Sequence, residues 1–263
     1  MLDFHNHLIP AVDDGSTSIE ESLAAVERMS AQGITHIITT PHFQASTVKR
    51  PAEFNAAMKG IDAGWEILVD AVRKNFPRMK LDRGVELALD DPDPVATDTR
   101  LRLAGTRFVL VEFPWFNIPT NSVQPLKRLK ANGVTPIVAH PERYDNTDPA
   151  FQILRDWRQV GAFLQLNAAS LTGGYGPRIE RNAWQCLRLG LVDFLSSDYH
   201  ARGVCAVAGA RERVVARGGE GLLRTLAGGN GDQLLGGLDP IPIGPLAAES
   251  PWGKLKRALA RLL

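Results

Sequence analysis

The chain has 263 residues, of which 44% are hydrophobic and 22% are charged, and its formal net charge at pH 7 is +1. It has enough apolar side chains to bury a core without cross-links, and its balanced charge gives no general reason to bind nucleic acid. Two cysteines are too few for a disulfide framework and indicate a reducing compartment. With no recognisable leader and no apolar run of the ~18 residues that a transmembrane helix needs, we expect a cytoplasmic protein.

Short apolar runs alternate with segments of helical periodicity. The expected strands are residues 2–4, 34–39, 81–87, 108–113, 135–139, 162–166 and 191–196. The expected helices are residues 19–32, 53–75, 123–132, 150–160 and 179–189. The first helix has a capping box formed by Ser18 and Glu21 and a stop at Gly33. Repeated alternation of this kind is typical of a parallel sheet with helices outside, and seven strands in series favour a barrel over an open sheet.

The composition changes after Arg217. Glycines are frequent between residues 218 and 237, and prolines follow between residues 240 and 251. We interpret residues 1–217 as the barrel and residues 218–263 as a loose extension of the same domain. Residues 252–263 predict a short basic amphipathic helix, which either docks on the barrel or is solvated, or contacts an anionic membrane surface.

Five of the six histidines fall at or just after the end of an expected strand. They are His5, His7, His42, His140 and His200. In a parallel barrel the carboxyl ends of the strands converge on one face, so residues distant in the sequence meet there. Each histidine alone is more often a packed or surface residue, but five at matching points of the repeat indicate metal ligands. His36 lies inside an expected strand, and we expect it to be packed rather than ligating.

Carboxylates occupy similar places. Glu86 and Glu112 lie in apolar strands, where a buried carboxylate is costly unless it is paired or binds a metal, although each alone could face solvent at an edge. Asp198 stands two residues before His200, repeating the spacing of the first two histidines. Asp14, in an Asp-Asp-Gly loop, belongs either to an ordinary turn or to the site.

Mixed imidazole and carboxylate ligands suit Mn²⁺, Fe²⁺ or Zn²⁺ better than Ca²⁺. A cluster of such ions generates hydroxide at neutral pH and neutralises the charge of a phosphate. The pattern therefore points to hydrolytic phosphoryl transfer.

Five motifs then carry a resemblance to a known family. They are LDFHNH at residues 2–7, DDG at 13–15, TPH at 40–42, HPERY at 140–144 and SDYH at 197–200. In this order, over residues 1–200, they resemble the PHP superfamily of phosphoesterases. More narrowly, the chain looks like the bacterial manganese-dependent tyrosine phosphatases of capsular and exopolysaccharide clusters, the CpsB/CapC/YwqE group. The wording around Glu86 and the presence of Asn6 depart from the usual family pattern.

The resemblance implies a distorted (β/α)7 barrel of the PHP type that holds three divalent metal ions. These ions would be Mn²⁺, with Fe²⁺ or Zn²⁺ as alternatives. By position, the first metal takes His5, His7, Glu86 and Asp198, the second shares Glu86 and adds Glu112 and His140, and the third takes Asp14, His42 and His200.

The resemblance also implies the reaction. A metal-bridging hydroxide would hydrolyse phosphotyrosine while Arg143, which matches the family's phosphate-contacting arginine, binds phosphate oxygens. Asp198 or a histidine such as His200 would protonate the phenolate. Arg202 and Arg211 are both candidates for the family's second arginine. The implied partner is a phosphotyrosine protein, such as the C-terminal tail of a membrane-associated bacterial tyrosine kinase.

Two alternatives stay open. One is a phosphoesterase of the same superfamily that acts on a small phosphomonoester such as histidinol phosphate. Another is a metal-binding module that docks on a kinase without catalysis. A third possibility, thiol chemistry, is suggested only by the Cys-x5-Arg spacing of Cys205 and Arg211. We interpret this spacing as a chance match, because the loop that such a thiolate needs is not recognisable around them.

Overall fold

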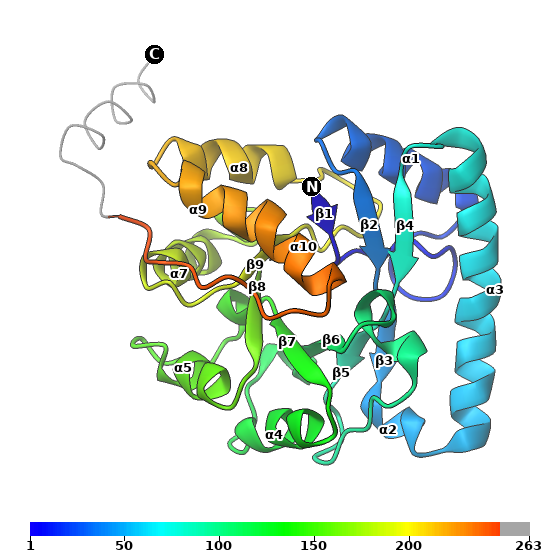
Figure 1. Ribbon diagram of the computed structural model, residues 1–263, viewed down its shortest axis with the longest axis horizontal. Helices are drawn as coiled ribbons and strands as arrows, with labels where there is room; N and C mark the ends of the chain where they lie inside the picture. Colours follow the sequence, from blue (N-terminus) through cyan, green and yellow to red (C-terminus); the bar gives the residue numbers. More distant parts are fainter. Residues whose placement is uncertain (248–263) are drawn as a thin grey trace.

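The computed structural model describes residues 1–247 and shows an α/β fold whose strands pair in parallel within two sheets (Figure 1). The strands are β1 (Leu2–Asp3), β2 (His36–Thr39), β3 (His42–Gln44), β4 (Lys80–Arg83), β5 (Glu86–Ala88), β6 (Phe108–Glu112), β7 (Thr135–Ala139), β8 (Phe163–Asn167) and β9 (Phe194–Ser196). The smaller sheet has the order β1-β2-β4, and the larger has the order β3-β5-β6-β7-β8-β9. The prediction of an α/β fold with parallel strands is confirmed.

One expected strand divides between the sheets, and another is followed by an unexpected strand in the second sheet. The chain leaves the smaller sheet after Thr39 and enters the larger one as β3, which the sequence did not predict. The prediction of a single strand over residues 81–87 is wrong, because this stretch forms β4 and then β5. The two breaks lie side by side, since the Gly84 amide donates to the Thr39 carbonyl and the Glu86 amide to the Pro41 carbonyl, each at 3.0 Å. These two neighbouring segments of the chain therefore pass together from the smaller sheet to the larger one.

The two sheets also meet where β1 and β9 end. Asn6 forms a parallel bridge with Tyr199. The His7 amide donates to the Tyr199 carbonyl at 2.9 Å, and the Asp198 amide donates to the His5 carbonyl at 2.7 Å. Segments almost 200 residues apart in the chain are thereby fixed next to each other.

Helices surround the sheets (Figure 1). They are α1 (Ile19–Ala31), α2 (Ala45–Val48), α3 (Pro51–Asn75), α4 (Val123–Ala131), α5 (Gln152–Gln159), α6 (Ala168–Leu171), α7 (Pro177–Arg188), α8 (Val207–Val215), α9 (Glu220–Arg224) and α10 (Asn230–Leu235). The five expected helices correspond to α1, α3, α4, α5 and α7, with each end within two residues of its predicted place.

Helix α1 illustrates how local sequence sets these ends. The Ser18 hydroxyl caps it by accepting from the Glu21 amide at 3.3 Å. The Glu21 carboxylate accepts instead from the Thr17 amide at 2.6 Å, so the reciprocal half of the expected capping box is displaced by one residue. The helix stops where Gly33 adopts a φ of 84°, which favours glycine.

The glycine-rich stretch after Arg217 is helical rather than loose, which corrects that expectation for residues 220–235. Helix α9, a π-helical turn (Thr225–Gly229) and α10 follow one another without interruption. Leu234 is fully buried in an apolar cluster with Leu2, Phe108 and Phe194. Gly231 allows a close approach here, because a Cβ at this position would lie 3.0 Å from the Leu2 side chain and Leu2 would have to shift. This stretch therefore covers one end of the sheets.

Within residues 1–247, no helix combines the length and the apolar character that crossing a membrane requires. The expected amphipathic helix of residues 252–263 lies outside the described residues.

Candidate metal centre

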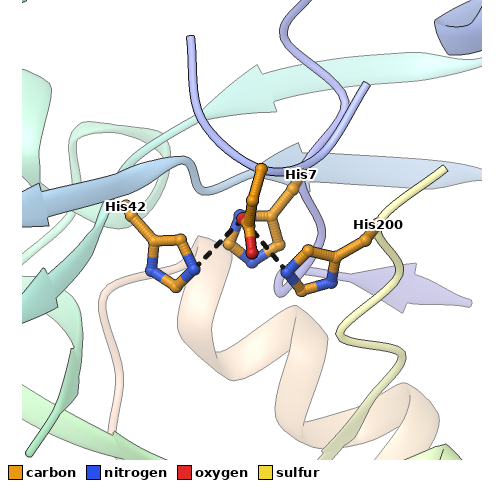
Figure 2. A group of neighbouring side chains, drawn as sticks. His7, His42 and His200 are labelled. Carbon is orange, nitrogen blue, oxygen red and sulfur yellow. Dashed lines mark ion pairs between the residues drawn. The ribbon is translucent and has the colours of Figure 1, made fainter. Parts of the chain in front are cut away.

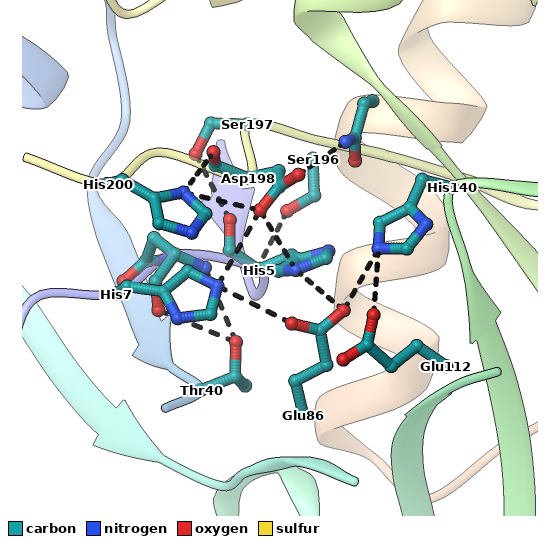
Figure 3. Close-up of polar contacts among 12 residues, drawn as sticks. His5, His7, Thr40, Glu86, Glu112, His140, Ser196, Ser197, Asp198 and His200 are labelled. Carbon is teal, nitrogen blue, oxygen red and sulfur yellow. Dashed lines mark hydrogen bonds and ion pairs between the residues drawn. The ribbon is translucent and has the colours of Figure 1, made fainter. Parts of the chain in front are cut away.

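All nine side chains that the sequence indicated as metal ligands lie in one cluster, and Figure 3 labels all of them except Asp14 and His42. His5 and His7 follow β1, and Asp14 lies in the next loop. His42 begins β3, Glu86 begins β5 and Glu112 ends β6. His140 follows β7, and Asp198 and His200 follow β9. The convergence that a parallel α/β fold predicts is therefore present in the structure.

Glu86 lies at the centre of this cluster and is fully buried. Its Oε1 lies 3.2 Å from His5 Nε2 and 3.1 Å from His140 Nε2. Its Oε2 lies 3.5 Å from His7 Nε2 and 3.1 Å from His42 Nδ1. Burial opposes ionisation of Glu86, but the surrounding imidazoles, led by His5, hold its pKa well below the usual range. Glu86 thus stays a carboxylate shared by four imidazoles.

Asp198 faces the same imidazoles from the opposite side. Its Oδ1 lies 3.2 Å from His5 Nε2 and 3.6 Å from His7 Nε2. Burial opposes the protonated form of His5. The carboxylates of Glu86 and Asp198 nevertheless raise the pKa of His5 to about 9.

A second group of ligands lies nearer the surface (Figure 2). The rings of His7 and His200 stack with centroids 4.0 Å apart, and the ring of His42 lies 4.5 Å from that of His7. Asp14 Oδ1 lies 3.5 Å from His42 Nε2 and 3.4 Å from His200 Nε2. On the other side of the cluster, Glu112 Oε1 lies 3.3 Å from His42 Nδ1.

Four overlapping sets of these side chains bring their ligand atoms within 4.8 Å of one another. The sets are His5-His7-Glu86, His5-His140-Asp198, His42-Glu86-Glu112 and His7-Asp14-His42-His200. The set of His7, Asp14, His42 and His200 contains the third set implied by the resemblance. The other groupings differ from the implied ones, because Asp198 joins His5 and His140, and because His42 rather than His140 joins Glu86 and Glu112.

Unpaired buried atoms mark the middle of the cluster. Among the described residues, His5 Nε2, His7 Nε2 and Glu86 Oε2 are buried and have no hydrogen-bond partner. Such atoms are rare in folded proteins. Here they lie 3.1–3.6 Å from groups of opposite charge, without the geometry of a hydrogen bond. Imidazole nitrogens and carboxylate oxygens that face one another in this way fit the ligand preferences of Mn²⁺, Fe²⁺ or Zn²⁺.

A layer of polar side chains behind the cluster fixes the orientation of the imidazoles. Gln165 Oε1 lies 2.8 Å from His5 Nδ1, and Asp13 Oδ2 lies 2.7 Å from His7 Nδ1. Both contacts direct the opposite ring nitrogen into the cluster. The sequence interpretation gave neither residue a role. Gln165 was detectable as a polar residue inside the apolar strand predicted at residues 162–166.

Arg143 reaches the cluster from the turn after β7. Its NH1 donates to Asp198 Oδ2 at 2.6 Å. Its guanidinium carbon lies 4.3 Å from the ring centroid of Phe116 and 4.2 Å from that of Tyr175. The two aromatic faces hold the guanidinium plane beside the ligands. Asn167 also donates to Asp198 Oδ2, at 2.6 Å.

The other arginine candidates have different surroundings. The two terminal nitrogens of Arg202 donate to the backbone carbonyls of Gly15 and Asp14, so Arg202 braces the loop that carries Asp14. Arg211 donates to the Gln32 carbonyl at 3.2 Å, near the end of α1. Neither is among the residues that line the cavity at the cluster.

Cys205 and His36 lie apart from the cluster. Burial raises the pKa of the Cys205 thiol to about 12, the opposite of what a thiolate nucleophile needs. His36 begins β2, at the end of the strand remote from the cluster, and its Nε2 lies 2.6 Å from Asp82 Oδ2.

A cavity of about 470 Å³ opens over the ligands. It is lined by seven of the nine predicted ligands together with Arg143, Trp115 and Phe116, while His5 and His7 lie buried beneath it. The cluster is therefore accessible to a ligand through this cavity.

The fold and the site together define an α/β protein with a candidate metal centre of imidazoles and carboxylates at the ends of its parallel strands. The chain belongs to the CpsB/CapC family of capsular polysaccharide synthesis, which it matches over residues 1–236. The resemblance drawn from the sequence motifs is confirmed.

Relatives and a solved structure agree with this assignment. Tyrosine-protein phosphatase YwqE of Bacillus subtilis is 28% identical over 202 residues, covering 76% of this chain and 77% of that protein. Tyrosine-protein phosphatase CpsB of Streptococcus agalactiae serotype III is 28% identical over 211 residues, covering 76% of this chain and 83% of that protein. One of the crystal structures of YwqE from Bacillus subtilis and CpsB from Streptococcus pneumoniae, described as unique metal-dependent tyrosine phosphatases, superposes with a TM-score of 0.76 and 26% identity. It covers 95% of this chain and all of that one.

Proposed function

We propose that this protein is a metal-dependent tyrosine-protein phosphatase. The observation that carries the proposal is the cluster itself, in which five imidazoles and four carboxylates converge next to a guanidinium held between two rings. The names of the relatives, tyrosine-protein phosphatases, supply the reaction and the substrate class.

The proposed ligands are the nine residues predicted from the sequence, and the unpaired buried nitrogens and oxygen between them support a polynuclear site. We infer three divalent ions, Mn²⁺ by preference and Fe²⁺ or Zn²⁺ as alternatives. Such ions, when bound, activate water and neutralise phosphate charge. The ligands that bridge sets, Glu86 above all, would keep the ions close together.

The fold that supports this centre is proposed to be a distorted (β/α)7 barrel. If β2 with β3 and β4 with β5 each count as one strand, seven strands follow one another around the sheets. The bridge between Asn6 and Tyr199 supports closure of this series. Residues 1–217 would form the barrel, and residues 218–263 would extend the same domain, which the burial of Leu234 supports.

The residues of the chain have distinct proposed roles in the reaction. Arg143 would bind phosphate oxygens through its planar fork and orient the phosphorus toward the ligands. Asp198 accepts from Arg143 and Asn167 through Oδ2 and faces two imidazoles through Oδ1, so it holds these groups in place rather than donating a proton. His200, partly exposed at the cavity, would hold a metal ion rather than donate a proton, and a departing phenolate needs little help from an acid. Arg202 would act indirectly, by holding the loop of Asp14.

The first experiment compares substrates. Purified protein with Mn²⁺ is assayed on a phosphotyrosine peptide and on histidinol phosphate. The proposal expects a kcat/KM at least about 100-fold higher on the phosphotyrosine peptide. Preference for histidinol phosphate would instead support a small-molecule phosphoesterase, and bound metal without hydrolysis of either substrate would support a binding module.

The natural partner is proposed to be a phosphotyrosine protein of capsule or exopolysaccharide synthesis, such as the tail of a membrane-associated tyrosine kinase. The family name supports this setting. A cytoplasmic location and a membrane contact through residues 252–263 stay predictions from the sequence. Deleting residues 252–263 and measuring binding to anionic vesicles tests the second, and unchanged binding would exclude it.

A further inference from the structure

The chain that leaves β6 has an uncommon backbone beside the metal cluster. In the 3-10 turn Pro114–Phe116, Trp115 has a φ of 62° and Phe116 has a φ of 49°. Non-glycine residues rarely adopt this left-handed conformation, and two bulky ones in succession do so only when the surroundings require it. As a result, the side chains of Trp115 and Phe116 lie in very different environments.

Phe116 has a clear role in the structure. Its ring lies 4.3 Å from the Arg143 guanidinium carbon, and its centroid lies 5.5 Å from that of His140. Trp115, by contrast, is 92% exposed. Within residues 1–247 its indole nitrogen has no hydrogen-bond partner. The fold therefore gains nothing from an indole at this position, and a large exposed aromatic side chain at the edge of a site is typical of contact with a ligand.

A second cavity of about 470 Å³ adjoins the metal cavity, and Trp115 lines both. The residues that line the second cavity lie at or just after the ends of β3, β5 and β6. These three strands are neighbours in the larger sheet. We call this cavity the flanking groove, and its lining includes Gln44, Leu89, Trp115, Asn117 and Pro119. A ligand anchored at the metals therefore has a continuous path past Trp115 into the flanking groove.

The polar groups of the flanking groove suit a peptide. Gln44 and Asn117 are exposed, and their side-chain amides make no hydrogen bond among the described residues. Each amide offers both a donor and an acceptor, as a peptide main chain requires. The carboxylate of Asp90, in contrast, is already engaged by the amide and the hydroxyl of Ser46, at 2.9 and 2.5 Å.

We propose that the flanking groove binds the peptide segment next to the phosphotyrosine, with Trp115 as the specificity-determining residue that covers this segment. The proposal rests on the proposed function and deepens it. The indole would pack on the side chain next to the phosphotyrosine, and the amides of Gln44 and Asn117 would pair with the main chain of the peptide. A small phosphomonoester would occupy the metal cavity alone and would not reach the flanking groove.

The test compares Trp115→Ala with the unmodified enzyme on two substrates that share the reaction, a phosphotyrosine peptide and phenyl phosphate. Loss of an aromatic contact of this kind lowers kcat/KM on the peptide about tenfold, mainly through KM, and leaves kcat/KM on phenyl phosphate within about twofold. Because Trp115 is exposed, we expect the melting temperature to be unchanged. Ile67→Ala, which removes an exposed apolar side chain from α3, is the matched control and should alter neither rate.

Fluorescence supplies an independent measurement. Binding of a peptide that carries a non-hydrolysable phosphotyrosine analogue to the Mn²⁺-loaded protein should change the tryptophan emission of the unmodified chain and not that of Trp115→Phe. Equal losses of kcat/KM on both substrates would overturn the proposal, because Trp115 would then contact the phenyl ring or the centre itself. Unchanged rates on both would also overturn it, as would a change in oligomeric state on sedimentation, which would assign Trp115 to an interface between copies. If the unmodified enzyme hydrolyses neither substrate, the proposed function itself fails.

Discussion

Glu86 shows why single residues at this site are so sensitive to substitution. It is fully buried, and both of its oxygens face imidazoles at distances between 3.1 and 3.5 Å. The sequence was sufficient to select Glu86, because a glutamate within an apolar strand needs a partner. It was insufficient for Gln165 and Asp13, because their contacts with imidazoles depend on which face of a strand or loop meets another segment.

Glu86→Gln should remove most of the activity. The amide keeps the shape of the side chain but loses the charge that faces four imidazoles, so metal affinity should fall and kcat/KM should drop at least about 100-fold. Metal content by mass spectrometry and the phosphatase rate measure the two effects. A variant with full metal content and full activity would contradict the assignment of Glu86 as the shared ligand.

Asp13→Ala should weaken metal binding without removing a ligand. The His7 ring would lose the acceptor that directs Nε2 into the cluster, and losses of this kind cost about 10–100-fold in metal affinity or activity. Titration of metal-free protein with Mn²⁺, followed by activity, measures the change. Asp70→Ala, at an exposed position on α3, is the control and should titrate like the unmodified protein.

Cys205→Ser should leave kcat/KM within about twofold of the unmodified enzyme, because a buried thiol of raised pKa takes no part in a metal-dependent reaction. His5→Ala should abolish activity in the same assay. If the cysteine variant were inactive and the histidine variant active, the chemistry would belong to the thiol and the metal assignment would be wrong.

At the level of elements, the division of one expected strand between the sheets could not be predicted from the sequence. Residues 81–87 show one apolar pattern, and only the pairing of Gly84 with Thr39 reveals the break. Helices with clear periodicity, such as α3 and α7, were predictable because their apolar faces repeat along the sequence. The helices α9 and α10 were not predictable, because their glycines signal a loop unless the close approach of Leu2 is known.

Leu234→Ala tests whether α10 belongs to the core. Its side chain is fully buried, so its truncation should lower the free energy of unfolding by about 2–5 kcal/mol. Urea denaturation measures the change. Leu238→Ala removes a side chain that is 57% exposed and should change the free energy of unfolding by less than about 0.5 kcal/mol. Equal and small effects would mean that the segment is a loose extension after all.

For the whole molecule, the metal centre ties together the places where the two sheets meet. Ligands following β1 and β9 lie at one junction, and ligands beginning β3 and β5 lie at the other. Ions that bind the folded chain and not the unfolded chain stabilise it by about 2.7 kcal/mol at 100 times their dissociation constant. The centre should therefore contribute to the stability of the fold as well as to catalysis.

Removal of metal should accordingly lower the melting temperature. A chelator should shift it down by about 5–10 °C in the unmodified protein, and added Mn²⁺ should restore it. Glu86→Gln should show a much smaller shift under the same treatment, since it starts with less metal. A melting temperature that is indifferent to chelation in the unmodified protein would argue against a metal centre that links the sheets.

Metal analysis coupled to a phosphatase assay tests the central claim most directly. Purified protein is stripped with a chelator and titrated with Mn²⁺, while bound metal and the hydrolysis of a phosphotyrosine peptide are measured in the same samples. The account predicts that activity is absent without metal and rises as more than one ion binds per chain. Full activity of the stripped protein, or binding of metal without any hydrolysis, would contradict it.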